Sequence, residues 1–81
     1  MQINVRLFAR ARDLAGAQSV SMELTEGATV ADLRRELLNV KPALEPLAGT
    51  LLVAVGSEYA ADTQILSPGA DVACFPPVSG G

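Results

Sequence analysis

The chain has 81 residues, 49% of them apolar, and its nine carboxylates against six basic side chains give a formal net charge of −3. This length indicates a single domain near the lower size limit for folding around one hydrophobic core. The negative balance argues against binding to nucleic acid or to an anionic membrane through bulk electrostatics.

Two segments near the N-terminus carry an apolar residue at every second position. They are residues 2–8 (QINVRLF) and residues 19–25 (SVSMELT), and their alternation predicts two half-buried strands. The connection between them is short enough for a wide antiparallel hairpin. Within that connection, residues 9–16 (ARARDLAG) offer about one helical turn before Gly16, which we interpret as too short for a separate element.

The spacing of apolar residues changes to a helical period in residues 26–40 (EGATVADLRRELLNV). Thr29 is a favourable N-cap, and Asp32 stands at the capping-box position three residues later. Pro42 prevents the helix from continuing beyond about Val40. The sequence therefore predicts one long helix over residues 29–40.

The second half of the chain predicts three more strands. Residues 51–55 (LLVAV) form an apolar run that suits a strand covered on at least one face, and residues 58–60 suit a short edge strand. Residues 71–75 (DVACF) form the last strand, which ends where Pro76 has no N–H to donate. Residues 42–49 are interpreted as an irregular connection. The order predicts an α+β fold with a mixed sheet and the helix packed across one face. The expected core comprises Ile3, Val5, Leu7, Val30, Leu33, Leu37, Leu52 and Val72.

The sequence ends in FPPVSGG. Pro76 and Pro77 favour an extended, stiff backbone, so we expect a domain at residues 1–75 followed by a tail at residues 76–81. The tail reaches at most about 20 Å. Glycines without Cβ atoms can enter a narrow channel, and a terminal carboxylate becomes an acyl donor once it is activated. We therefore expect a tail that is inserted into a partner and chemically modified.

Residues 68–81 (PGADVACFPPVSGG) resemble the C-terminus of the small-subunit family of molybdopterin synthase, which closes on a DGDEVAFFPPVSGG pattern. Looser similarity covers residues 5–16 (VRLFARARDLAG), residues 29–37 (TVADLRREL) and residues 51–55, in the same order. The resemblance implies the ubiquitin-like β-grasp fold. Two departures from the family pattern, Gly56 and Cys74, lie outside the tail.

The resemblance also implies a sulfur carrier that binds no cofactor and is not an enzyme on its own. A ubiquitin-activating-like adenylyltransferase would use ATP to adenylate the terminal glycine, which then becomes a thiocarboxylate. The tail would enter the large subunit, in an assembly of two large and two small subunits, and give sulfur to cyclic pyranopterin monophosphate. The implied acyl site is Gly81, with Gly80 and Ser79 in the inserted tail. The implied partner-binding residues are Phe75, Pro76, Pro77 and Val78.

Three other functions remain open from the sequence. A sulfur carrier for thiazole synthesis or tRNA thiolation would also end in Gly–Gly, although such carriers generally lack the FPP segment. A protein modifier would join the same glycine to lysines, and a plain interaction module would leave the tail unused.

The remaining features of the sequence predict the cellular compartment of the protein and the surroundings of several single residues. No apolar run is long enough to span a bilayer and no signal peptide stands at Met1, and a lone cysteine suits a reducing compartment, so we expect a cytoplasmic protein. With no histidine and one cysteine, we expect no metal site.

Cys74 is interpreted as a core residue rather than a sulfur relay. Arg34 and Arg35 are interpreted as solvated, while Leu44 and Leu47 fit either core or interface. Three arginines near the end of the first strand either guide an acidic surface or are simply solvated: Arg6, Arg10 and Arg12.

Overall fold

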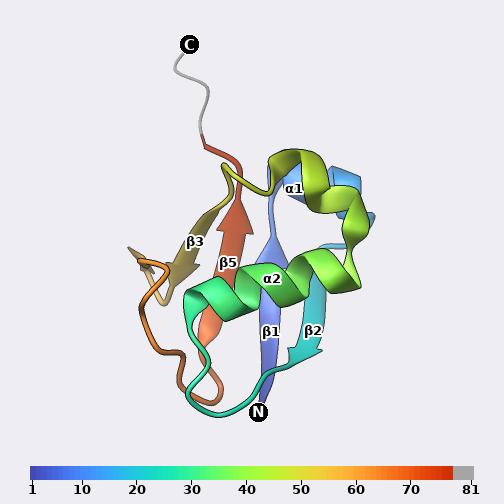
Figure 1. The fold of residues 1–81 in the computed structure, drawn as a ribbon. Helices are drawn as coiled ribbons and strands as arrows, with labels where there is room; N and C mark the ends of the chain where they lie inside the picture. The colour runs from blue at the N-terminus through green and yellow to red at the C-terminus, as the bar shows by residue number, and fades with distance from the viewer. Residues whose placement is uncertain (78–81) are drawn as a thin grey trace.

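The computed structural model describes residues 1–77, and it folds into a five-stranded sheet with one main helix across it. The strand order is β2-β1-β5-β3-β4. The pair β1–β5 is parallel and the other pairs are antiparallel, which confirms the predicted mixed sheet. The elements are β1 (Gln2–Leu7), α1 (Ala9–Ala15), β2 (Ser19–Glu23), α2 (Val30–Val40), the 3-10 helix η1 (Pro42–Leu47), β3 (Leu52–Val55), β4 (Glu58–Tyr59) and β5 (Asp71–Phe75). Figure 1 shows α2 crossing the strands.

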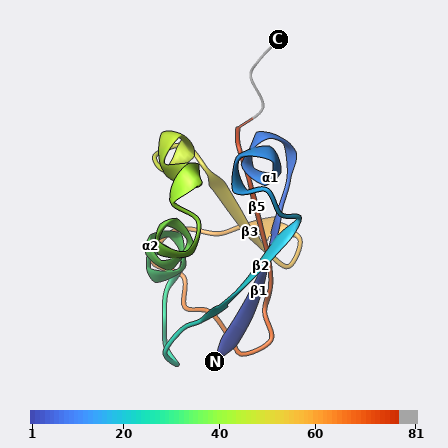
Figure 2. The ribbon, with the colours of Figure 1, turned by 90° about the vertical axis from the view of Figure 1, so that its right-hand side faces the viewer.

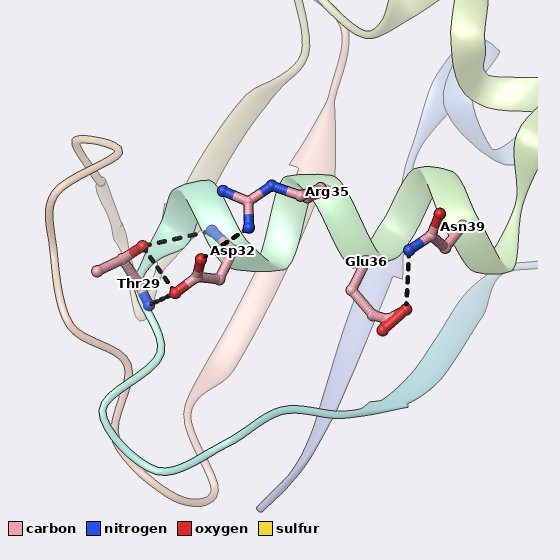
Figure 3. A network of polar contacts seen from close by, with 5 residues as sticks. All are labelled: Thr29, Asp32, Arg35, Glu36 and Asn39. Carbon is pink, nitrogen blue, oxygen red and sulfur yellow. Dashed lines mark hydrogen bonds and ion pairs between the residues drawn. The ribbon is translucent and has the colours of Figure 1, made fainter.

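Helix α2 begins and ends where the sequence predicts. The Thr29 hydroxyl oxygen accepts from the Asp32 backbone N–H at 3.3 Å, and the Thr29 N–H donates to the Asp32 carboxylate at 3.0 Å (Figure 3). The hydrogen bond from the Thr29 backbone is the main cause that lowers the pKa of Asp32. This capping box satisfies donors that the first turn of a helix leaves free. It fixes the helix so that Val30, Leu33 and Leu37 are buried.

Side chains on the face of the sheet toward α2 form the core. Figure 2 shows α2 on one side of the strands, and we call that side the inner face. The predicted inward residues of the first two strands are all buried, as are Val72 and Cys74 on β5. Leu37, Val53 and Cys74 border the same small hollow, which places them between the sheet and α2. The buried residues of this core are Ile3, Val5, Leu7, Ala11, Val20, Met22, Leu24, Ala28, Val30, Leu33, Leu37, Leu44, Leu51, Val53, Leu66, Val72 and Cys74. Ala73 is also buried but lies on the opposite side of β5.

The prediction that Leu52 belongs to the core is wrong. Leu52 is only half-buried, whereas its neighbours Leu51 and Val53 are buried. In the β3–β5 register, Val53 lies opposite Cys74 on the inner face, so Leu52 lies opposite Phe75 on the other face. We call that other side the outer face.

Two connections are more ordered than the sequence suggests. Residues 9–15 form a separate helix, α1, which ends at Gly16 with a φ of 68° and a hydrogen bond from the Gly16 N–H to the Arg12 carbonyl. Residues 42–47 form η1, whose Leu44 is fully buried, so Leu44 is a core residue. The two short helices lie near each other at one end of the molecule (Figure 1).

Arg34 is not simply solvated. Its Nε donates to the Asp62 carboxylate at 2.7 Å, and its Nη1 donates to the Leu51 carbonyl. The Ala31 N–H also donates to the Asp62 carbonyl at 3.0 Å. Arg34 therefore joins α2 both to the segment before β5 and to the start of β3. Arg35 is exposed and pairs with Asp32 at 3.2 Å.

Candidate functional site

The predicted tail begins at the end of β5, a strand that has neighbours on both sides. β5 pairs with β1 on one side and with β3 on the other, and its last residue is Phe75. Pro76, which follows, is half-buried, and Pro77 is exposed. Because proline has no N–H, the ladder cannot continue through these two residues. Val78, Ser79, Gly80 and Gly81 lie outside the described residues, and their predicted roles stay predictions.

An apolar patch on the outer face surrounds this exit point. The β3–β5 register places Leu52 opposite Phe75 and Ala54 opposite Ala73, and β4 adds Tyr59 opposite Ala54. The Tyr59 and Phe75 rings have their centroids 5.6 Å apart and are tilted by 50°, a favourable aromatic geometry. Tyr59 is 68% exposed even so. We call these five residues the outer patch.

Phe75 itself is half-buried, and an exposed aromatic ring beside other apolar side chains is typical of surfaces that bind another protein. The neighbouring β4 strand has two residues, so the patch stands at one edge of the sheet. The sequence identified Phe75 but not Leu52 or Tyr59 as candidate binding residues. The available signal was the chain's single tyrosine on a predicted edge strand, where an apolar ring has little core to join.

Cys74 is adjacent to Phe75 in sequence but belongs to the inner face. Its side chain is fully buried, and burial raises the pKa of its thiol from an ordinary 9.0 to about 11, with the Arg34 charge opposing the rise. A neutral, inaccessible thiol is a poor nucleophile. The interpretation of Cys74 as a core residue is confirmed.

The described residues offer no other chemical centre of a familiar kind. Between Met1 and Pro77, no group of three or more histidine, cysteine, aspartate or glutamate side chains is arranged to hold a metal ion. No helix in this part of the chain is long and apolar enough to cross a membrane. The candidate site is therefore the exit of the tail with the outer patch around it.

Comparison with known proteins gives this site a context. The model of the ThiS family matches residues 5–81. The chain is 39% identical to the molybdopterin synthase sulfur carrier subunit of Chlamydomonas reinhardtii, over the full length of both proteins.

Solved structures agree on the architecture. The crystal structure of SAMP1 from Haloferax volcanii matches with a TM-score of 0.90 and 31% identity, covering all of both chains. A ubiquitin from Caldiarchaeum subterraneum matches with a TM-score of 0.67 and 18% identity, covering all of this chain and 98% of that one. The fold is therefore ubiquitin-like, as the resemblance in the sequence implies.

Proposed function

This chain belongs to the ThiS family, and from that membership we propose that it is the sulfur-carrier subunit of molybdopterin synthase. The observation that carries the proposal is its similarity, over the whole length, to a sulfur carrier subunit of that enzyme. A second observation supports it. The last strand ends at Phe75, which is half-buried and lies beside the exposed Tyr59 ring, and a partner that takes the tail would also find an apolar surface there.

The proposed chemistry takes place on Gly81. A carboxylate oxygen attacks the α-phosphate of ATP on an adenylyltransferase, and pyrophosphate leaves. A sulfur nucleophile at the oxidation level of sulfide then attacks the acyl carbon and displaces AMP, which leaves a thiocarboxylate. The large subunit uses this sulfur to build the dithiolene on cyclic pyranopterin monophosphate, and water returns the carboxylate. The carrier contributes no catalytic side chain, because Gly81 and Gly80 present none.

The outer patch has a separate role in this proposal, which is docking. Phe75 and Tyr59 stand at the base of the tail, with Pro76 and Pro77 extending from them and Val78 beyond. A partner that covers the patch would hold this base, so that Ser79, Gly80 and Gly81 reach its active site. Buried aromatic groups commonly supply most of the binding energy at such interfaces. The large subunit, in a heterotetramer of two large and two small subunits, and the adenylyltransferase are the proposed partners.

A ubiquitin-like protein modifier is the second candidate. The similarity to SAMP1, small archaeal modifier protein 1 of Haloferax volcanii, favours it. Both functions start with activation of the terminal glycine. They differ in the nucleophile that takes the acyl group, which is a sulfur donor for a carrier and a lysine amine for a modifier.

Mass spectrometry of the carrier after incubation with its activating enzyme, ATP and sulfide tests the proposal. We expect one oxygen to be exchanged for sulfur. Oxidation of a methionine gives nearly the same mass change, so fragmentation must place the change on Gly81, and deletion of Gly81 must abolish it. With the large subunit and the pterin precursor added, sulfur should leave the carrier and dithiolene should form. Lysine conjugates in place of dithiolene would support the modifier, and an unmodified Gly81 under all conditions would contradict both.

Tyr59→Ala tests the docking role separately. We expect weaker binding to the large subunit, because the exposed ring of the outer patch is lost, with little change in stability since Tyr59 is mostly exposed. Glu58→Ala is the matched control, since Glu58 is exposed on the same strand with its side chain on the opposite side. Equal binding by the two variants would show that the outer patch is not an interface.

A further inference from the structure

A hollow with a basic lining lies on the outer face of β1 and β2, at the start of α1. Its volume is about 330 Å³. Besides Leu7, the residues that line it are two arginines, an asparagine, a glutamine, a serine and a phenylalanine. These are Arg6, Arg12, Asn4, Gln18, Ser19 and Phe8. We call it the basic hollow.

The charges around the basic hollow leave it positive. Arg6 pairs with Asp71 at 3.0 Å, but both side chains are about half exposed or more, so the pair is weak. The Arg6 guanidinium also lies over the Phe8 ring, 5.7 Å from its centroid. Arg12 forms no ion pair within residues 1–77, and no carboxylate lines the hollow. Although the chain has a net charge of −3, the local positive charge of the basic hollow favours an anionic ligand there.

The position of Phe8 connects the basic hollow with the tail exit. The Phe8 N–H donates to the Cys74 carbonyl at 3.2 Å, so Phe8 lies beside the end of β5. Phe8 is 41% exposed. The next residue, Ala9, has a φ of 53°, a left-handed conformation that non-glycine residues rarely adopt. The chain therefore turns sharply at this point, between the strand that carries Arg6 and the helix that carries Arg12.

The sheet order places the basic hollow and the outer patch on either side of the tail exit. The hollow lies over β1 and β2, and the patch lies over β5, β3 and β4, which follow in that order across the sheet. A protein that covers the outer patch and receives the tail would also contact the basic hollow, which is adjacent to the tail exit. Its own surface there would have to balance the two arginines.

We propose that the basic hollow receives one or two aspartate or glutamate side chains of the protein that docks on the outer patch. The inference rests on the proposed function, because it assumes a partner that covers the exit of the tail. A planar guanidinium matches a carboxylate with two parallel hydrogen bonds, and the amides and the hydroxyl supply further donors. Arg12, which has no ion pair among residues 1–77, and Arg6, which is already shared with Asp71, suit a carboxylate. They do not suit a nucleic acid, whose many phosphates the net charge of the chain repels.

Charge reversal at Arg12 is the sharpest test. The binding of the large subunit of molybdopterin synthase from the same organism is measured over a range of salt concentrations, with wild type, Arg12→Glu and Arg35→Glu. Arg35→Glu changes the net charge by the same amount on α2, which removes long-range charge effects from the comparison. We expect Arg12→Glu to weaken binding by about tenfold or more at low salt, mostly through slower association, and the loss to shrink as salt is added. Arg35→Glu should stay within about twofold of wild type. Thermal unfolding confirms that each variant is folded.

The outcomes separate this inference from the proposed function. If Tyr59→Ala weakens binding while Arg12→Glu matches Arg35→Glu, the hollow is not part of the interface and the inference is overturned, although the proposed function stands. If wild type does not bind the large subunit at all, both fail. A loss with Arg12→Glu that does not depend on salt would also overturn the inference, because a carboxylate contact at an exposed arginine must be screened.

Discussion

Leu51 and Leu52 are adjacent, chemically identical and assigned to opposite faces of the sheet, so the same substitution at each should have opposite consequences. Leu51 is 5% exposed and Leu52 is half-buried in the outer patch. Truncation of leucine to alanine removes three carbon atoms, roughly 2.4 kcal/mol of apolar transfer at about 0.8 kcal/mol each. A residual cavity brings the expected cost of Leu51→Ala to about 2–5 kcal/mol.

That cost is a large share of the stability of so small a domain, which is typically on the order of 4–12 kcal/mol at this length. A loss of about 3 kcal/mol should lower the melting temperature by about 12–24 °C. Leu52→Ala should cost about 1 kcal/mol or less, but should weaken binding of the large subunit. Urea unfolding and binding measurements on both variants check this. If Leu52→Ala is the more destabilising of the two, the assignment of the faces is wrong.

Three further predictions concern the domain. Thr29→Ala should lower the free energy of unfolding by about 1 kcal/mol, because the capping box is lost. The control Thr25→Ala changes an exposed loop side chain and should lower it by roughly a few tenths of a kcal/mol. Equal losses of stability in the two variants would contradict the role of the cap. The pKa of Cys74 is raised by folding, so the stability from its neutral thiol is full below pH 9 and is lost as the pH rises through about 11. Between pH 9 and a pH above 11, the free energy of unfolding of wild type should therefore fall by on the order of 2–3 kcal/mol more than that of Cys74→Ala. Urea unfolding at several pH values measures both, and an equal pH dependence of the two proteins would refute the prediction. Ala9→Gly should be neutral or stabilising by up to about 1 kcal/mol, because glycine accepts a positive φ; Ala15→Gly, at a right-handed helical position, should cost about 1 kcal/mol, and an equal loss at Ala9 would show that its backbone is not strained.

Elements with a local signal were predictable from the sequence. α2 has a cap at Thr29, a stripe of apolar residues at helical spacing and a proline after its end, so its bounds follow from neighbours in the chain. The first two strands alternate strictly, and that alternation identifies their buried face. In each case, the information lies within a few residues of the element itself.

Elements without such a signal depend on distant residues. Helix α1 has seven residues, and Phe8 at its N-terminus provides no side-chain cap. A helix of this length is not stable alone. It forms because Ala11 is buried and Leu14 packs on the core. In β3, an unbroken apolar run does not say which residues face the helix. That choice is made by the pairing of Val53 with Cys74, on a strand that follows later in the chain.

Some residues of the candidate site could be predicted from the sequence, and others are brought together only by the fold. Phe75, Pro76 and Pro77 were singled out because a resemblance and the properties of proline are visible in the sequence alone. Tyr59 and Leu52 join Phe75 only through the β3–β4 and β3–β5 registers, which no local pattern states. Their roles in docking, like those of the last four residues, stay predictions.

Alternation along β5 explains how one strand can support both the fold and a partner. Val72 and Cys74 point to the inner face, and Ala73 and Phe75 point to the outer face, because successive side chains of a strand point to opposite sides. Cys74 borders a hollow of about 10 Å³ on the inner face, together with Leu37 and Val53. Arg34 also lines that hollow, and its guanidinium donates to the Asp62 carboxylate and to the Leu51 carbonyl. The core contacts of Cys74 on the inner face therefore do not involve Phe75, which the proposed partner would contact on the outer face.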